Sequence, residues 1–262
     1  MLKIQDLSIT YGKNPSPTVT GFSLDMKPGE IVSIVGESGS GKTTVIRAVL
    51  GCLAGGGVVS HGDIQFEGTS LTGLSKEAWR ALRGTKISMI FQDSGAMINP
   101  IRKIGPQFVE YIRTHQRMSK REAWERGVEM LERMRLPSGD NIMRSYPFQL
   151  SGGMRQRVGI AMAMTFQPKL LLGDEPTSAL DVTTQAQIVR QMLALREQYG
   201  TGMIIVTHNL GVAAYMADRI LVMKDGRVVD QGSRDRILSH PASDYTRRLL
   251  ESVPAMGGER FV

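Results

Sequence analysis

The residues that could do chemistry begin with a glycine-rich segment at 36–43, which reads Gly-Glu-Ser-Gly-Ser-Gly-Lys-Thr. Glycines let backbone N–H groups close around an anion, and the N-terminus of a following helix adds partial positive charge. In such a phosphate loop, Lys42 would reach the β- and γ-phosphates of a nucleotide, and the Thr43 hydroxyl would bind Mg²⁺. A glycine-rich turn that matches by chance is the alternative that the motif alone leaves open.

Two adjacent carboxylates, Asp174 and Glu175, follow an apolar run at 170–172. A buried strand that ends in this way can present both carboxylates at the carboxyl edge of a sheet, where a phosphate loop also opens. Asp174 would hold Mg²⁺ directly or through water, and Glu175 would act as general base toward an attacking water. The alternative is a strand that ends in a solvated acidic turn.

A third segment, Ser151-Gly152-Gly153, precedes an apolar run of helical character. Small residues before a helix leave backbone N–H groups free to bind a phosphate. Taken alone, the same residues could simply start a capped helix.

Strands and helices must position these groups. Alternating patterns predict strands of a small antiparallel sheet, and continuously apolar runs predict central parallel strands that are covered on both faces. The alternating segments are 2–10, 21–26 and 62–67, and the apolar runs are 31–35, 169–172, 203–206 and 220–223. Helical patterns separate most of the apolar runs, and one begins near Thr43, so the fold class is predicted to be α/β.

The middle of the chain, from about Gln92 to Gln149, shows no convincing strand. Ser119 and Glu122 match a capping box at a helix start, and Pro137 is expected to end that helix. Trp124 lies on its apolar face and is interpreted as a packing residue. This region is predicted to be a helical insertion in an α/β core.

Composition sets outer limits on the interpretation. The chain has 262 residues and a net charge of +7, and 41% of its residues are hydrophobic, which suits one large domain or a domain with an insertion. No apolar run is long enough to span a bilayer, the N-terminus does not read as a secretory signal, and the single Cys52 excludes an internal disulfide. No nucleic-acid module is recognised, so we expect a solvated basic surface near a membrane and no nucleic-acid partner.

These motifs, in this order and over nearly the whole chain, resemble the ATP-binding subunit of an ABC transporter. The signature of that family is similar to residues 150–156, its Q-loop glutamine falls at Gln92 after a strand at 87–91, and its D-loop resembles residues 178–181. Its switch histidine falls at His208, and Tyr11 falls where an aromatic residue stacks on adenine. Without the family, Tyr11, Gln92 and His208 would have only structural interpretations.

The resemblance implies a P-loop NTPase (RecA-like) core with an N-terminal antiparallel β subdomain and an inserted α-helical subdomain. The whole chain, 1–262, would be a single ABC ATPase domain. Its catalytic α/β core would comprise 1–91 and 156–262, the helical insertion would run from the Q-loop into the signature over 92–155, and a C-terminal tail would occupy 240–262.

The resemblance also implies a role for each site residue. Two ATPase subunits would form a head-to-tail dimer in which the signature of one closes over ATP held by the other. Glu175, His208 and Gln92 would be catalytic, with Gln92 sensing the γ-phosphate, and Thr43, Gln92 and Asp174 would hold Mg²⁺. The implied ATP contacts are Tyr11, Gly36, Ser38, Gly39, Ser40, Gly41, Lys42, Thr43, Thr44, Ser151, Gly152, Gly153 and Asp181.

Several segments look like the peptide and nickel importers within this family. They are residues 37–39, Asn99-Pro100, residues 146–148, Met154 and a tail that runs from His240-Pro241 through Tyr245 to Pro254. Many peptide-importing relatives continue into a cysteine-bearing extension, and the sequence ends before it. This feature favours the shorter nickel-type members or a peptide type with a truncated tail. Met154, Gly173 and Asn209 depart from common family residues, but none removes a catalytic group, so an active ATPase is predicted.

The expected function is therefore to energise an ABC importer for peptides or nickel from the cytoplasmic face of the inner membrane, as a peripheral subunit. Its partners would be a second, identical or paralogous ATPase subunit, integral membrane permeases and, indirectly, an extracytoplasmic substrate-binding protein. The alternative is an ABC-type ATPase attached to a soluble enzyme complex, as in phosphonate breakdown. A chromosome or DNA-repair ATPase is disfavoured because no long coiled coil is visible.

Overall fold

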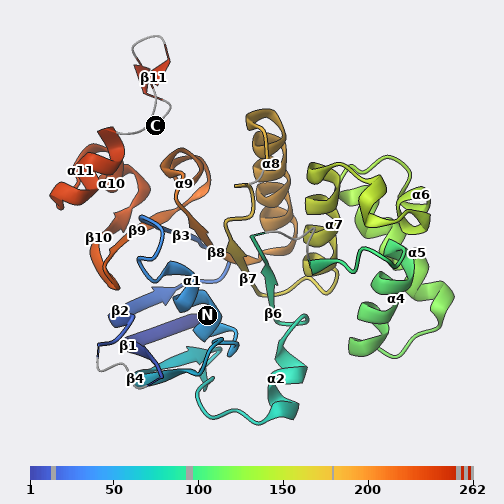
Figure 1. Cartoon of the computed structure of the whole chain (residues 1–262), viewed down its shortest axis with the longest axis horizontal. Coiled ribbons are helices and arrows are strands. Elements are labelled where there is room, and N and C mark those ends of the chain that lie inside the picture. The colour runs from blue at the N-terminus through green and yellow to red at the C-terminus, as the bar shows by residue number, and fades with distance from the viewer. Residues whose placement is uncertain (13–15, 93–96, 179, 252–254, 257–258, 261–262) are drawn as a thin grey trace. The chain divides into compact units, whose positions relative to one another are not determined.

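The computed structural model describes residues 1–12, 16–92, 97–178, 180–251, 255–256 and 259–260. The chain forms two compact units (Figure 1). Unit 1 comprises Met1–Trp79 and Gly202–Val262, and unit 2 comprises Arg80–Thr201. The boundary between them falls within helix α2 (Lys76–Leu82).

Unit 1 contains the predicted antiparallel sheet, in the order β2-β1-β4-β5. Its strands are β1 (Leu2–Tyr11), β2 (Val19–Met26), β4 (Gly57–Phe66) and β5 (Thr69–Ser70). β1 pairs with β2 on one side and with β4 on the other, both antiparallel. Along β2, buried and exposed residues alternate, which is the pattern that one covered face requires.

The parallel strands of unit 1 are β3 (Ile31–Val35), β8 (Gly202–Thr207) and β9 (Arg219–Lys224). β3 lies between the other two and is parallel to both, and every residue of β3 and β8 is buried. The continuously apolar runs therefore form central strands, as predicted. Strand β10 (Arg227–Ser233) was not predicted, although the Asp225-Gly226 pair that joins it antiparallel to β9 is a hairpin signal.

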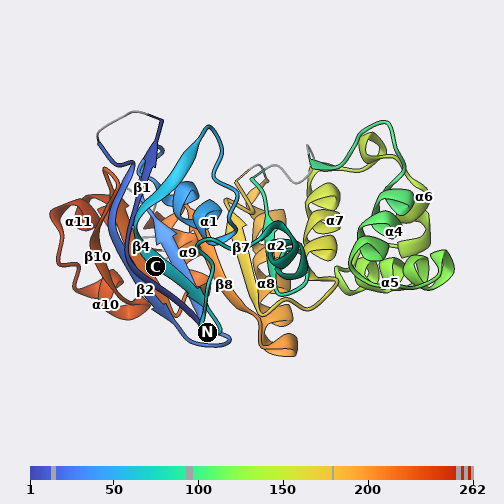
Figure 2. The ribbon, with the colours of Figure 1, turned by 90° about the horizontal axis from the view of Figure 1, so that it is seen from below.

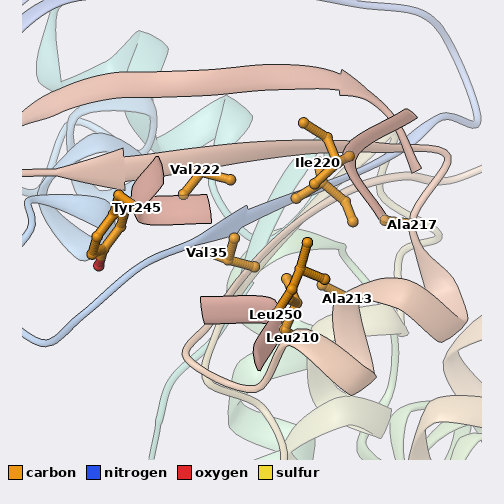
Figure 3. Close-up of a cluster of buried hydrophobic side chains, with 9 residues drawn as sticks. Val35, Leu210, Ala213, Ala217, Ile220, Val222, Tyr245 and Leu250 are labelled. Atoms are coloured by element: carbon orange, nitrogen blue, oxygen red, sulfur yellow. The ribbon is translucent and has the colours of Figure 1, made fainter. Parts of the chain in front are cut away.

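The helices of unit 1 are α1 (Lys42–Val49), α9 (Leu210–Met216), α10 (Arg234–Ser239) and α11 (Asp244–Glu251). A short hairpin, β11 (Ala255–Met256) and β12 (Glu259–Arg260), follows α11. Residues of β3, α9, β9 and α11 share one hydrophobic cluster, which includes Val35, Val222, Tyr245 and Leu250 (Figure 3). The C-terminal helix is thus packed into the core around β3.

Unit 2 pairs two parallel strands, β6 (Ile87–Ile90) and β7 (Leu170–Asp174), and carries most of the helices. These are α4 (Ile104–His115), α5 (Lys120–Arg133), α6 (Gly139–Arg144), the 3₁₀ helix η1 (Pro147–Gln149), α7 (Gly152–Met164) and α8 (Val182–Tyr199). Figure 2 shows α4, α5 and α6 gathered together. Among the described residues between 92 and 149 there are helices and no strand, as the sequence predicts.

Hydrogen bonds between residues close in sequence define both ends of helix α5. The Ser119 hydroxyl accepts a hydrogen bond from the Glu122 N–H, and the Glu122 carboxylate accepts one from the Ser119 N–H, which confirms the predicted capping box. The helix ends at Arg133, before the expected stop at Pro137, because Arg135 adopts a left-handed conformation (φ 54°). The N–H of Leu136 then bonds back to the Leu131 carbonyl, which is the hydrogen bond of a Schellman motif.

Trp124 packs within unit 2, as predicted. Its ring lies so close to Gly105 of α4 that a Cβ there would be 2.3 Å away, and its indole N–H donates to Asp140 at 2.8 Å. Among the described residues, no helix combines the length and the apolar composition that a bilayer crossing requires.

Asp230 of β10 ties the C-terminal helices to the sheet. Its side chain is 1% exposed and accepts hydrogen bonds from the Arg236 guanidinium (2.7 Å), the Ala242 N–H (2.8 Å) and the Ser243 N–H (3.2 Å). Burial alone would raise the pKa of this carboxyl, but these hydrogen bonds and the charge of Arg236 outweigh it and lower the pKa. Asp230 therefore holds α10 and the start of α11 against β10.

We expect Asp230→Asn to lower the free energy of unfolding at pH 7 by about 1–3 kcal/mol, because the buried hydrogen bonds lose their charged acceptor. The folded pKa of Asp230 lies below its ordinary value of 3.8, so its contribution is present above that pH and is lost as the pH falls through the folded pKa. Urea unfolding at a series of pH values measures both effects. Asp235→Asn, at an 82% exposed side chain, is the matched control, and equal losses in the two variants would contradict the assignment.

Candidate functional site

The phosphate loop, residues 36–43, connects β3 to α1 in unit 1. Gly36 has φ 150°, and a Cβ built on it would lie 2.1 Å from the carbonyl oxygen of Met223 in β9. No other residue can occupy this position without moving the backbone of one strand or the other. The loop can therefore follow β3 closely only because its first residue has no side chain.

Lys42 is buried at the N-terminus of α1, with 5% of its surface exposed. Its ammonium group donates hydrogen bonds to the carbonyl oxygens of Gly36 (2.7 Å) and Glu37 (2.6 Å), and it lies 3.4 Å from the Ser40 hydroxyl. The charge is thus held inside the loop by the loop's own carbonyl groups. A buried cation beside a helix N-terminus provides the electrostatics that phosphate binding requires.

The remaining predicted residues of the loop differ in exposure. Ser40 is buried, Thr43 and Thr44 are half-buried, and Ser38 and Gly39 are exposed. The first turn of α1 is closed by the hydrogen bond from the Val45 N–H to the Gly41 carbonyl. The Lys42 ammonium and the hydroxyl groups of Ser40, Thr43 and Thr44 therefore lie around the N-terminus of α1.

His208 also lies at this edge of unit 1. β3 and β8 are parallel neighbours in which Val35 aligns with Thr207, so Gly36 and His208 follow the carboxyl ends of adjacent strands. His208 is exposed, and the next residue, Asn209, caps α9 by accepting hydrogen bonds from the Gly211 and Val212 N–H groups. Asn209 therefore has a capping role that the sequence interpretation did not include.

Tyr11 ends β1 and is half-buried. Its ring covers Gly57 so closely that a Cβ at that glycine would be 2.6 Å from the ring. The predicted adenine-stacking residue thus has a fixed position against β4.

In unit 2, the paired carboxylates lie at the carboxyl end of β7, as the sequence predicts. Asp174 is the last residue of the strand and is 4% exposed, whereas Glu175 is half-buried and adopts a left-handed conformation (φ 46°). Such a conformation costs a non-glycine residue about 1–3 kcal/mol and is common at functional sites. The buried Gln156 of α7 holds the turn that follows by donating to the Pro176 carbonyl at 2.6 Å.

Gln92 belongs to the same edge of unit 2. β6 and β7 are parallel, and Ile90 aligns with Gly173, so Gln92 follows the end of β6 as the carboxylates follow the end of β7. Gln92 is exposed. Residues 93–96 of the expected Q-loop lie outside the described residues.

The signature residues form the start of α7. Ser151 is the N-cap, its hydroxyl accepts a hydrogen bond from the Met154 N–H at 3.2 Å, and both Ser151 and Gly152 are exposed. Gly153 packs on α8, because a Cβ there would lie 2.6 Å from the Thr184 methyl group.

Asp181 caps α8. Its carboxylate accepts hydrogen bonds from the Thr184 hydroxyl (2.6 Å) and the Thr184 N–H (2.9 Å), and these bonds lower the pKa of Asp181. Of the expected D-loop, Ala179 lies outside the described residues.

The residues expected to hold Mg²⁺ suit that ion chemically. The Thr43 hydroxyl, the Asp174 carboxylate and the Gln92 amide all offer oxygen atoms, the donors that Mg²⁺ prefers together with phosphate oxygens and water. Asp174 provides the charged member of the set from a buried strand end. No group of three or more His, Cys, Asp and Glu side chains able to hold a metal occurs within the described part of the chain.

Sequence reasoning missed long-range contacts to the phosphate loop, such as the hydrogen bond from the Gly226 N–H to the Ser40 carbonyl at 3.2 Å. The Glu37 N–H donates to the hydroxyl oxygen of Tyr245 in α11 at 3.1 Å. The tail that contains Tyr245 was noted only for its resemblance to importers, and no local pattern places it beside residues 36–43. Only the packing of α11 in the core reveals this neighbour.

Comparison with known proteins gives concordant matches. Residues 19–178 match the family described as ABC transporter. The oligopeptide transport ATP-binding protein AppD of Bacillus subtilis is 42% identical over 99% of this chain and 80% of its own length. The dipeptide transport ATP-binding protein DppD of Haemophilus influenzae is 41% identical over 97% of this chain and 78% of its own length. Among solved structures, a dimeric ATP-binding cassette in a post-hydrolysis state, bound to ADP and Pi, has a TM-score of 0.78 at 29% identity and covers 89% of this chain and 99% of that chain.

We expect Gly36→Ala to destabilise unit 1 by about 3 kcal/mol or more, because its methyl group would collide with the Met223 carbonyl. Gly39→Ala is the matched control in the same loop, since φ there is 82° but nothing lies within 4 Å of the new Cβ. The control should lose only the backbone cost of about 1–2 kcal/mol. Urea unfolding compares the variants, and a larger loss in Gly39→Ala would contradict the close approach at Gly36.

Proposed function

Because the chain belongs to the ABC transporter family, we propose that it is the ATP-hydrolysing subunit that energises an importer for oligopeptides or dipeptides. The fold and the ATPase activity are those of the family. The observation that carries the proposal is the buried Lys42 ammonium inside a glycine-rich loop at a helix N-terminus. That arrangement is suited to the phosphate groups of a nucleotide.

In the proposed site, the phosphate loop and Lys42 bind the phosphates of ATP, and Tyr11 stacks on adenine. The backbone N–H groups of the loop and the charge of Lys42 would stabilise the negative charge that phosphoryl transfer redistributes. The proposed contacts in this unit are Gly36, Ser38, Gly39, Ser40, Gly41, Lys42, Thr43 and Thr44.

Hydrolysis is proposed to depend on Glu175, His208 and Gln92. Glu175 accepts a proton from the attacking water as general base, His208 orients that water and the γ-phosphate, and Gln92 senses the γ-phosphate. Thr43, Asp174 and Gln92 hold Mg²⁺, which when bound neutralises phosphate charge. The position of Glu175 directly after the carboxyl end of the buried strand β7 supports this assignment, since ligands of α/β sheets bind at that edge.

We propose that two ATPase subunits, identical or paralogous, pair head to tail. Ser151, Gly152, Gly153 and Asp181 of one subunit would act on the ATP held by the other. The exposure of Ser151 and Gly152 supports this role, because their N–H groups at the start of α7 are accessible to a partner's ligand. The dimeric solved cassette described above provides a precedent for such pairing.

The proposed organisation retains the catalytic core at 1–91 and 156–262, the helical insertion at 92–155 and the tail at 240–262. The insertion would contact integral membrane permeases, and an extracytoplasmic substrate-binding protein would act through them. The chain would therefore lie peripherally at the cytoplasmic face of the membrane. The finding that α4, α5 and α6 pack together supports an insertion that forms a compact helical subdomain.

Peptides are the cargo that the relatives favour, since AppD and DppD are described as oligopeptide and dipeptide transport proteins. Neither name mentions nickel, and neither points to a soluble enzyme complex. We therefore propose peptide import and give no support to the nickel or phosphonate-type alternatives.

Glu175→Gln is expected to leave ATP affinity unchanged and to lower kcat by about 10²–10⁴-fold, because the amide cannot accept the proton of the attacking water. Equilibrium binding of ATP with Mg²⁺ and steady-state release of phosphate measure the two effects in the assembled complex. Glu197→Gln, at an exposed glutamate of α8, is the control with the same change of charge. Wild-type turnover in Glu175→Gln would remove Glu175 from the role of base.

Cells that lack the chain should lose uptake of labelled di- or oligopeptides, and the wild-type chain but not Lys42→Ala should restore it. Uptake of Ni²⁺ should stay unchanged in the same cells. Affinity purification from membranes should recover the chain with integral membrane proteins. Loss of Ni²⁺ uptake alone, or recovery only in a soluble enzyme complex, would exclude peptide import.

A further inference from the structure

The C-terminal helix α11 brings a tyrosine to the phosphate loop. Tyr245 lies in the first turn of α11 and is 7% exposed. It belongs to the hydrophobic cluster that contains Val35, the last residue of β3, together with Val222 and Leu250 (Figure 3). The Lys224 ammonium lies 5.1 Å from the centroid of the Tyr245 ring, within range of a cation–π interaction. Packing in the cluster and the contact with Lys224 therefore hold the ring in place independently of the hydrogen bond that its hydroxyl makes.

The hydroxyl of Tyr245 and the ammonium of Lys42 bind opposite sides of one peptide group. In the peptide group that joins Gly36 to Glu37, the N–H donates to the Tyr245 hydroxyl at 3.1 Å. The carbonyl of the same group accepts from Lys42 at 2.7 Å. A peptide group is planar and stiff, so a bond that orients its N–H also orients its carbonyl. Two hydrogen bonds on one peptide group also polarise and strengthen each other.

Tyr245 retains its proton in this contact. Burial raises the pKa of its hydroxyl, the hydrogen bond from Glu37 N–H opposes the rise, and the negative charges of Glu37 and Asp225 add to it. The Tyr245 side chain therefore stays a neutral phenol over the physiological pH range, and its oxygen accepts the hydrogen bond from the Glu37 N–H.

The position of α11 is in turn held by Asp230, which accepts hydrogen bonds from Ala242 and Ser243 just before the helix. A rigid connection thus extends from β10 through α11 to the peptide group that holds Lys42. The aliphatic residues that pack beside Tyr245 could be replaced by others of similar volume, but an apolar side chain at position 245 could not accept the Glu37 N–H.

We propose that Tyr245 is a positioning residue for Lys42, which it aligns through the Gly36–Glu37 peptide group, and that the C-terminal helix is thereby coupled to ATP binding. The inference rests on the proposed binding of ATP phosphates by the phosphate loop. Loss of the hydroxyl would let the peptide group rotate, and the ammonium would lose one of the two carbonyl groups that orient it. By thermodynamic linkage, bound ATP should in return stabilise α11.

The test uses the full-length chain and a fluorescent ATP analogue with Mg²⁺. Tyr245→Phe keeps the ring in the cluster and removes the hydroxyl, together with its bonds to the N–H and the carboxylate of Glu37, so the Kd should rise about three- to tenfold. Tyr215→Phe, at a tyrosine of α9 in the same unit that is 57% exposed, should leave the Kd unchanged. The thermal midpoint should fall more in Tyr245→Phe than in Tyr215→Phe, because only the former leaves a part-buried N–H without its acceptor.

Hydrogen exchange provides a readout that a purely structural role of the ring would not change. In Tyr245→Phe the amide of Glu37 should exchange faster than in the wild type, while the amides of α11 stay protected. Addition of ATP should slow exchange in α11 of the wild type but not of Tyr245→Phe. An unchanged Kd together with unchanged exchange at Glu37 would overturn the proposal.

Two further variants distinguish failure of the proposed phosphate site from failure of the proposed coupling between α11 and that site. If Lys42→Ala binds the analogue as tightly as the wild type, Lys42 does not contribute to phosphate binding. This result would contradict the proposed function, independently of the result for Tyr245→Phe. Leu250→Ala loosens α11 while keeping the hydroxyl, since Leu250 is buried in the same cluster. It should raise the Kd as Tyr245→Phe does, and faster exchange in α11 with no change in Kd would overturn the coupling.

Discussion

The hydrogen bonds between the Lys42 ammonium and the carbonyl groups of Gly36 and Glu37 are the interaction on which the site depends. They hold a buried cation at the start of α1, and they require the backbone to turn sharply at the end of β3. That turn is available only to glycine, because the Met223 carbonyl of the neighbouring strand β9 occupies the space that a Cβ would need. The close packing of β3 against β9 therefore also restricts the first residue of the loop that holds Lys42 to glycine.

Parallel strands explain how each unit gathers the residues that are proposed to function. In unit 1, β3 and β8 end side by side, which brings the phosphate loop and His208 to one edge. In unit 2, β6 and β7 do the same for Gln92 and the carboxylates Asp174 and Glu175. Parallel pairing places the carboxyl ends of strands together whatever the residues between them are, so segments far apart in the sequence can supply one reaction. The helices α7 and α8 add residues whose first task is local: Ser151 and Asp181 cap their own helices.

Much of this could be predicted because the responsible interactions are local. The buried strands read as apolar runs, the capping box of α5 needs only Ser119 and Glu122, and the loop glycines have a spacing that few other structures use. Two local features were nevertheless missed, and a third depends on a distant partner. β10 was missed although the Asp225-Gly226 turn precedes it, and α5 ends before Pro137 because Arg135 takes a left-handed conformation. No short pattern would have placed the hydroxyl of Tyr245 on the Glu37 N–H.

The sequence by itself determined the family and the α/β class, and it supplied the residues proposed to bind and hydrolyse a nucleotide, because each of these follows from residue types at short, fixed spacings. The tertiary structure alone decided which groups hold the loop in place. Long-range contacts such as Met223 to Gly36 and Tyr245 to Glu37 join residues about 190 to 210 positions apart, and their formation depends on how strands and helices pack. Close approach of backbone and side chains in a dense core is a property of the whole fold, so no short sequence pattern predicts it.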